Sequence, residues 1–415
     1  MPARVVVLGG GVGGTLTANL LDKELGGDVK ITVVDAIGLH EYQPGYLYVA
    51  LGKASGHWLS RDERTLLRSG VELAVERAIR VLPYAQTVQL ERGGSLDWDY
   101  LVVATGSRLV HDAIPGLVEG AHGFYSLQDA ERLREALRVF PGGRIRIGVA
   151  GIPYKCPPAP VEFTFMVEEY LRDRGIRDRS EVTLLSPLNR AFTIESASKL
   201  VQPIMEERGI ELTTFFNVEA VDPSAGTVES LEGERVEYDL LVLVPPHQGQ
   251  QVVIDSGLGD AGGWIPTDKH TLQVSGYERI FAIGDATDLP ISKSGSTAHF
   301  EAPVIASRIA SMIRGSTPKT NYGGRVMCFL ETGNGRATAL RFDYEHPPIP
   351  PQPNRAWHMA KWLFNRLYWE TVPQGRIPEW MSQGGEEHER DDREDPRPER
   401  ALVPDADRQD GAGRP

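Results

Sequence analysis

Two cysteines, Cys156 and Cys328, are the side chains of this chain best suited to redox chemistry. A sequence of 415 residues with only two cysteines has no disulfide framework. If the two thiols pair, a redox role is therefore favoured over a structural staple. Lys155 directly precedes Cys156. The alternative is two buried, inert thiols, which is the usual fate of free cysteine.

A glycine-rich segment near the N-terminus has the spacing of a dinucleotide-binding turn. It follows a predicted strand over residues 4–8 and opens a predicted helix over residues 15–25. Such a turn lets a pyrophosphate approach the helix N-terminus. Asp35 ends the next strand, where an acid accepts hydrogen bonds from ribose hydroxyls. We predict dinucleotide binding, the alternative being a tight turn without a ligand, and the glycines involved are Gly9, Gly11, Gly13 and Gly14.

Two later segments indicate that the dinucleotide is FAD rather than NAD. One segment follows a short strand and consists of Ala104, Thr105 and Gly106. In the other, a strand over residues 280–283 ends in Gly284 and Asp285. Both resemble segments of flavoproteins with two dinucleotide-binding domains. The resemblance implies that the aspartate contacts the ribityl–phosphate region of FAD, and that the helix over residues 296–313 points its N-terminus at the flavin.

A second strand–turn–helix unit begins at residues 144–150. Gly148 and Gly151 stand where a nicotinamide-binding protein of this kind would carry a second glycine pattern, but only part of the pattern is present. Prolines crowd the start of the following helix, at positions 153, 157 and 158. We therefore expect this turn to present Cys156 instead of binding a second dinucleotide.

The segments around the cysteines resemble those of the sulfide:quinone oxidoreductases and of the flavoprotein subunit of flavocytochrome c sulfide dehydrogenases. The resemblance covers about residues 1–382 and rests on residues 9–14, 154–162, 284–299 and 327–333. It implies that Cys156 and Cys328 form a disulfide attacked by hydrosulfide, which leaves a persulfide on Cys156 while Cys328 lies against the flavin. The electrons would pass through FAD to a membrane quinone.

Two charged residues match positions that the family uses near this chemistry. Glu162 follows Cys156 on the first turns of a helix. There it would relay protons, with a pKa raised by burial; the alternative is a solvated helix residue. Lys293 matches a lysine near the flavin–quinone edge, where its charge would favour reduced flavin. For Lys293 the alternative is a surface lysine in a loop.

One departure from the family concerns additional cysteines. Tyr125 stands where many members have a third cysteine, and residues 40–46 lack the cysteine that tethers the flavin in others. We therefore predict non-covalent FAD. A small persulfide handed to an acceptor is favoured over a long polysulfide as the product.

The alternation of strands and helices predicts an α/β fold with two Rossmann-like dinucleotide-binding domains and a C-terminal membrane-facing helical segment. We assign residues 1–112 and 247–318 to a discontinuous FAD-binding domain and residues 113–246 to the second Rossmann-like domain. Residues 319–383 form a region that faces quinone and membrane. Residues 384–415 are polar and charged, and we expect a disordered tail there.

Residues 355–371 form a predicted helix that is rich in tryptophan. One apolar stripe of this helix contains Trp357, Ala360, Leu363, Phe364, Leu367 and Tyr368. Off the stripe lie Lys361, Trp362, Asn365, Arg366 and Trp369. Aromatic side chains beside lysine and arginine suit the lipid headgroup boundary. We predict peripheral membrane association through this helix, and the alternative is a helix packed on the domain or in an oligomer contact.

The composition is that of an ordinary globular protein with a formal net charge of −13 and no basic patch, so we expect no nucleic acid partner. No signal peptide and no apolar run long enough to span a bilayer are visible. We expect a cytoplasmic enzyme bound peripherally to the inner face of the cell membrane. No metal site is expected, and a homo-oligomer is left open.

Two other enzymes are alternatives to a sulfide:quinone oxidoreductase. A type II NADH:quinone oxidoreductase needs an intact second nucleotide cradle and no cysteine pair. A sulfide dehydrogenase subunit that passes electrons to a cytochrome calls for an export signal. A non-enzymatic flavin-binding subunit would leave Cys156 and Cys328 without a role.

Overall fold

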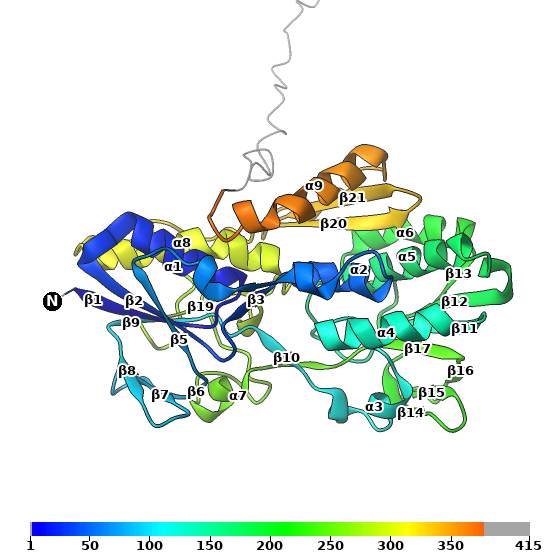
Figure 1. Ribbon diagram of the computed structural model, residues 1–415, viewed down its shortest axis with the longest axis horizontal. Helices are drawn as coiled ribbons and strands as arrows, with labels where there is room; N and C mark the ends of the chain where they lie inside the picture. Colours follow the sequence, from blue (N-terminus) through cyan, green and yellow to red (C-terminus); the bar gives the residue numbers. More distant parts are fainter. Residues whose placement is uncertain (1, 377–415) are drawn as a thin grey trace, which may run out of the picture.

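Two parallel β-sheets stand side by side in the protein, and a hairpin and a C-terminal helix lie across them (Figure 1). The computed structural model describes residues 2–376. The predicted tail over residues 384–415 lies outside the described residues, as do residues 377–383 of the predicted membrane-facing region. The two parallel sheets confirm the predicted α/β, Rossmann-like fold. The domain boundaries stay a prediction.

The first sheet has five parallel strands in the order β19-β9-β1-β2-β5. Valine and isoleucine dominate its central strands, as expected where both faces of a sheet are covered. Their bounds are Ala3–Leu8 (β1), Val29–Asp35 (β2), Val71–Val75 (β5), Tyr100–Val103 (β9) and Ile280–Ala282 (β19).

Alternate side chains of β1 enter two separate cores on either side of this first sheet. Val5 and Val7 pack with the two long helices α1 (Val12–Leu25) and α8 (Gly295–Ile313). Val6 and Leu8 pack with a small antiparallel sheet on the opposite face. That sheet consists of β6 (Ala78–Leu82), β7 (Thr87–Leu90) and β8 (Ser95–Asp97).

The second sheet has four parallel strands in the order β13-β12-β11-β17 and repeats this layout. Its strands are β11 (Gly143–Val149), β12 (Ser180–Leu185), β13 (Ile210–Thr213) and β17 (Leu240–Val244). Three helices cover one face, namely α4 (Leu127–Val139), α5 (Ala159–Asp173) and α6 (Glu195–Glu207). An antiparallel sheet covers the other, made of β14 (Val218–Asp222), β15 (Thr227–Ser230) and β16 (Arg235–Glu237).

The chain crosses between the two sheets twice, and the crossing segments pair with each other. It leaves the first sheet through β10 (Ser107–Leu109) and returns through β18 (His247–Gly249), which is antiparallel to β10. The remaining short elements are β3 (Leu39–Glu41), α2 (Tyr46–Ala50), β4 (Ser60–Asp62), α3 (Leu117–Gly120) and α7 (Gln251–Asp255).

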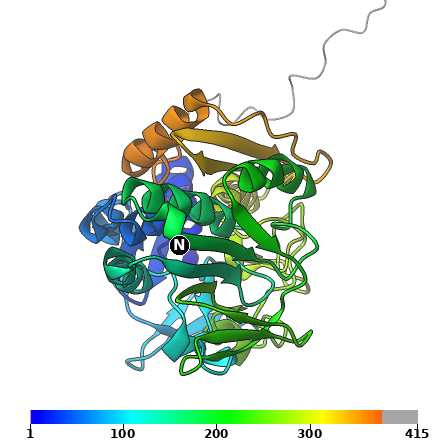
Figure 2. The same cartoon turned by 90° about the vertical axis from the view of Figure 1, so that its right-hand side faces the viewer.

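A hairpin and the last helix form an outer layer that touches both sheet units (Figure 2). The hairpin pairs β20 (Val326–Gly333) with β21 (Arg336–Phe342), and α5 runs along β20. Helix α9 (Arg355–Thr371) packs on β21, and its bounds confirm the predicted helix over residues 355–371. Its N-terminus is capped by Asn354, whose side chain accepts a hydrogen bond from the Trp357 N–H at 3.0 Å. No helix within residues 2–376 is long and apolar enough to cross a bilayer.

Candidate active site

The glycine turn between β1 and α1 has the shape that a pyrophosphate needs. A Cβ on Gly14 would lie 1.9 Å from the Gly9 carbonyl oxygen, so only glycine lets the helix pack this closely on the turn. A Cβ on Gly11 would meet no atom of the described chain within 4 Å, so open space lies beside the N-terminus of α1. The turn therefore offers backbone N–H groups and the positive end of a helix to an anion.

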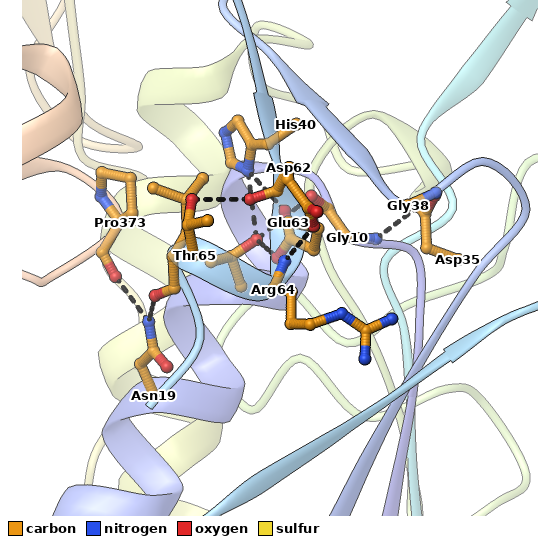
Figure 3. Close-up of polar contacts among 12 residues, drawn as sticks. Gly10, Asn19, Asp35, Gly38, His40, Asp62, Glu63, Arg64, Thr65 and Pro373 are labelled. Carbon is orange, nitrogen blue, oxygen red and sulfur yellow. Dashed lines mark hydrogen bonds and ion pairs between the residues drawn. The ribbon is translucent and has the colours of Figure 1, made fainter. Parts of the chain in front are cut away.

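Asp35 at the end of β2 holds this turn in place (Figure 3). Its Oδ2 accepts a hydrogen bond from the Gly10 N–H at 2.8 Å. Its Oδ1 accepts one from the Gly38 N–H at 2.7 Å and one from the Ile37 N–H at 3.0 Å. The Asp35 carboxylate thus accepts hydrogen bonds from three backbone N–H groups. Carboxylate oxygens accept several hydrogen bonds each, so the predicted contact with a ribose hydroxyl stays a prediction.

A buried polar network lies next to the glycine turn, and no motif in the sequence predicts it. The Thr15 hydroxyl in α1 donates to Glu63 Oε1 at 2.6 Å, and Glu63 Oε2 lies 3.1 Å from His40 Nδ1 (Figure 3). His40 Nε2 lies 2.7 Å from the Tyr368 hydroxyl of α9. Burial raises the pKa of Glu63, and its hydrogen bond with His40 opposes this effect. The network joins the glycine turn to the C-terminal helix through residues that are far apart in the sequence.

The other two predicted cofactor segments lie at the same edge of the first sheet. β1, β9 and β19 are adjacent and parallel, so the segments that follow their carboxyl ends meet there. Within residues 2–376, the Thr105 hydroxyl and Asp285 Oδ1 are buried without a hydrogen-bond partner. Burial raises the pKa of Asp285, and the nearby Lys155 and Lys293 lower it. Buried polar atoms without partners are what a bound polar ligand would satisfy, so these residues fit FAD.

Lys293 is buried, which excludes the alternative of a surface lysine in a loop. Its Nζ donates to the carbonyl oxygens of Thr287 and Asp285, the latter at 3.2 Å. The ammonium also lies 4.0 Å from the ring centroid of Trp264, within range of a cation–π interaction. Burial lowers the pKa of Lys293, and Asp285 raises it. Its place near a flavin–quinone edge stays a prediction.

Cys156 and Cys328 lie near each other although they belong to different parts of the fold. Cys156 lies in the turn between β11 and α5, and its N–H donates to the Lys293 carbonyl oxygen at 2.6 Å. Cys328 lies in β20, and the side chain of Ser294, which follows Lys293 in the chain, lies beside its thiol. Both cysteines pack against the same hydrophobic core. Each is a free thiol in the described chain, so the disulfide between them stays a prediction.

The two thiols share an environment that keeps them protonated. Burial raises the pKa of Cys156 to about 12; charge on Cys328 adds to this effect and Lys361 opposes it. Burial likewise raises the pKa of Cys328 to about 12, against a lowering by Ser294. Cys156 also has a φ of 52°, in the left-handed region that residues other than glycine rarely adopt. Backbone strain of this kind clusters at functional sites.

Tyr125 lies beside Cys156, at the position where the family resemblance places a third cysteine. Its hydroxyl donates to the Cys156 carbonyl oxygen at 3.3 Å, and its ring meets His247 edge-on at 5.6 Å. Burial lowers the pKa of His247 to about 3, and Lys155 adds to this effect. A tyrosine therefore contacts the backbone of Cys156 in this chain, and a neutral histidine packs on the ring of that tyrosine.

Glu162 is buried in the first turn of α5, with 3% of its surface exposed, so the alternative of a solvated helix residue is wrong. The Lys361 ammonium of α9 donates to Glu162 Oε1. The same ammonium lies 3.4 Å from Glu331 Oε1, which also accepts a hydrogen bond from the Tyr48 hydroxyl. Sequence reasoning missed Lys361, because nothing in the helical pattern distinguishes a lysine paired in the core from one in solvent. The proton-relay role of Glu162 stays a prediction.

Helix α9 splits the predicted apolar stripe between two faces. Lys361, Tyr368 and Trp369 are buried against the protein. Trp362 is 52% exposed and Met359 60% exposed on the outer face, and Leu363 and Leu367 are exposed with them. Polar contacts determine this orientation, because Lys361 must reach its carboxylate partners and Tyr368 must reach His40.

The pyridine nucleotide-disulphide oxidoreductase family matches residues 3–302 of the chain. A mouse protein described as sulfide:quinone oxidoreductase, mitochondrial, is 28% identical over 361 residues, which are 84% of this chain and 80% of that protein.

Solved structures agree with this family. The X-ray structure of the sulfide:quinone oxidoreductase from Aquifex aeolicus matches with a TM-score of 0.81 and 26% identity, covering 91% of this chain and 93% of that one. The structure of NDH2 from Plasmodium falciparum with NADH matches with a TM-score of 0.71 at 14% identity, covering 91% and 97%. At that identity the NDH2 match indicates the fold alone.

Proposed function

Because the chain belongs to the pyridine nucleotide-disulphide oxidoreductase family, we propose that it is an FAD-dependent sulfide:quinone oxidoreductase whose redox pair is Cys156 and Cys328. One observation carries the proposal. The two cysteines are far apart in the sequence, yet they contact the consecutive residues Lys293 and Ser294, close to the predicted cofactor segment. The mouse and Aquifex relatives support sulfide as the electron donor and quinone as the acceptor.

The sulfur chemistry follows from the cysteine pair in its oxidised form. Hydrosulfide attacks Sγ of Cys156, a new sulfur–sulfur bond forms there, and the bond to Cys328 breaks. The electron pair of the broken bond stays on Cys328 as a thiolate, and the proton of hydrosulfide stays on the persulfide. Glu162, buried on the helix that follows Cys156, is the carboxylate we assign to the subsequent proton transfer.

The residues that would hold FAD come from the edge of the first sheet. The turn at Gly11 and the N-terminus of α1 would receive the pyrophosphate, and Thr105 and Asp285 offer buried polar atoms that lack partners within residues 2–376. When bound, FAD accepts an electron pair from the sulfur site and passes it on to quinone. No cysteine stands at position 125 or within residues 40–46, where the family resemblance places further cysteines, so the cofactor is held non-covalently.

The runner-up function, NADH:quinone oxidoreduction, has less support from the second unit. In the first unit, α1 begins at Val12, shortly after β1 ends at Leu8. In the second unit, β11 ends at Val149 but α5 begins only at Ala159, and the long intervening turn holds three prolines and Cys156. A turn this long does not bring the N-terminus of a helix close to a pyrophosphate at the end of the strand.

Peripheral attachment to a membrane through residues 355–371 is part of the proposal. The outer face of α9 exposes Met359, Trp362, Leu363 and Leu367, with Arg366 between them. Apolar and tryptophan side chains beside an arginine suit the headgroup boundary of a bilayer, and quinone must be reached from there. We place the attachment on the cytoplasmic face of the cell membrane.

An anaerobic flavin assay tests the proposal. Purified holoenzyme is mixed with sulfide or with NADH while the flavin absorbance is followed. We expect bleaching by sulfide and none by NADH; the reverse result would overturn the assignment. Cys156→Ser and Cys328→Ser, each with FAD content matched to the wild type, should lose at least about 99% of the sulfide–quinone activity. Retained activity in either variant would exclude the cysteine mechanism.

A further inference from the structure

Helix α9 turns Lys361 inward, whereas Met359, Trp362, Leu363 and Leu367 face outward. Lys361 is 6% exposed, whereas Trp362 next to it is largely exposed. Burying an ammonium group costs several kcal/mol unless it is paired and hydrogen-bonded. A helix that only covered a core would turn its apolar side inward. The inward position of Lys361 therefore needs a separate explanation.

The Lys361 ammonium joins the two elements that carry the cysteines. Glu162, its hydrogen-bond acceptor, lies in the first turn of α5, directly after the turn that holds Cys156. Glu331, whose Oε1 lies 3.4 Å from the Lys361 ammonium, is in β20 three residues after Cys328. α5 and β20 pack along each other. One cation from a third element thus bridges the two at the end where the sulfurs meet.

The carboxylates on either side of Lys361 are themselves enclosed. Glu331 is 7% exposed, and burial raises its pKa while its hydrogen bond from Tyr48 lowers it. Asn365, one turn along α9, donates to the Tyr48 hydroxyl at 3.3 Å. Two buried carboxylates that face each other repel unless a cation stands between them. Without Lys361, α5 and β20 would therefore be pushed apart at this point.

Lys361 also acts on Cys156 through its charge. Its positive charge lowers the pKa of Cys156, against the larger effect of burial. Reciprocally, burial lowers the pKa of Lys361, and charge on Cys156 raises it. The cation is therefore within electrostatic range of Cys156 and also contacts the carboxylates of the two elements that carry the cysteines.

We propose that Lys361 is a positioning residue of the sulfur site: by bridging Glu162 and Glu331 it holds the elements of Cys156 and Cys328 at the spacing a disulfide requires. The inference rests on the proposed function, in which the two cysteines are the redox pair. It also makes the outward-facing helix α9 part of the sulfur site.

The thiol–disulfide equilibrium of the holoenzyme tests this role without sulfide. Wild type, Lys361→Met and Lys361→Arg are equilibrated with oxidised and reduced dithiothreitol, and the trapped thiols are counted by mass spectrometry. In Lys361→Met the equilibrium constant for the Cys156–Cys328 disulfide should fall about tenfold, which corresponds to about 30 mV. Lys361→Arg keeps the cation and should restore the constant to within about threefold of the wild type.

Arg208→Met is the matched control, because Arg208 links the same two elements farther from the cysteines. Its Nε donates to Glu168 of α5 at 2.8 Å, and its Nη1 donates to the Thr332 carbonyl oxygen of β20. This variant should unfold at lower urea concentration yet keep the disulfide constant within about twofold. An equal fall of the disulfide constant in Lys361→Met and Arg208→Met would show that Lys361 contributes only to packing, and it would overturn the proposal.

Two further measurements keep the inference separable from the proposed function. If Lys361→Met does not fold, Lys361→Met combined with Glu162→Gln also removes one of the two carboxylates that Lys361 contacts. The bridge is still lost but the repulsion between the carboxylates is relieved, so a fall of about threefold to tenfold is expected. An unchanged disulfide constant in whichever variant folds would overturn the role of Lys361. If sulfide fails to bleach the wild-type flavin, the proposed function fails, whereas the dithiothreitol equilibrium still decides whether Lys361 positions the cysteines.

Discussion

Glu301 offers a sharp quantitative test of the cofactor edge of the structure. It lies in α8 with 0% of its surface exposed, and its Oε2 accepts a hydrogen bond from the Gly284 N–H at 2.6 Å. Its other oxygen has no hydrogen-bond partner within residues 2–376. Burial raises the pKa of Glu301 from 4.5 to about 8, and the bond from Gly284 opposes this effect. The folded protein therefore holds a proton here that the unfolded chain releases.

The sign and size of the effect follow from proton linkage. A carboxyl group whose pKa is higher in the folded state stabilises that state fully below pH 4.5 and loses the contribution as the pH rises through 8. Each pH unit between these values changes the free energy of unfolding by about 1.4 kcal/mol. The whole effect is about 5 kcal/mol, of which about 3 kcal/mol falls between pH 5 and pH 8.

Urea unfolding of Glu301→Gln and wild-type holoenzyme at several pH values measures this contribution. The amide keeps an acceptor for Gly284 but cannot titrate, so the free energy of unfolding of wild type should fall by about 3 kcal/mol more than that of the variant from pH 5 to pH 8. Glu207→Gln, at an exposed position of α6, is the control and should run parallel to the wild type. Parallel curves for wild type and Glu301→Gln would contradict a raised pKa of Glu301 in the folded protein.

Three other predictions concern the sulfurs, the glycine turn and the membrane helix. In reduced protein, alkylation of Cys156 and Cys328 by iodoacetamide should accelerate about tenfold per pH unit from pH 8 to 11. Only the thiolate reacts, and burial raises both pKa values to about 12. A plateau of the alkylation rate below pH 10 would contradict this prediction. Gly14→Ala places a Cβ 1.9 Å from a carbonyl oxygen of the turn. The variant should therefore lose about 3 kcal/mol of stability or lose FAD on gel filtration. A wild-type FAD ratio together with a wild-type melting temperature would count against the tight turn. Trp362→Ser combined with Leu363→Ser should weaken binding to liposomes about tenfold, measured by sedimentation, and unchanged binding would remove α9 as the membrane contact.

Local patterns in the sequence were enough for the parts of the site that one β-α-β unit builds. Gly11 and Gly14, followed by Asp35 at the end of the next strand, predict a tight turn, and the structure contains that turn with Asp35 hydrogen-bonded to it. The predicted helix over residues 355–371 also agrees with α9. These features depend on residues close in sequence, where backbone geometry and periodicity decide the outcome.

The sequence alone was enough to select the candidate residues for the chemistry, namely two cysteines, a glycine turn, and the acid and lysine that match the family resemblance. What each of these residues touches depends on the tertiary structure. Nothing in the helical pattern predicted that Lys361 would face inward to Glu162, or that Tyr368 would reach His40. Such contacts join elements from distant parts of the chain, so they depend on how the hairpin and α9 lie across both sheets. Helical periodicity specifies which side chains share a face, but the packing of the whole molecule determines which face is buried.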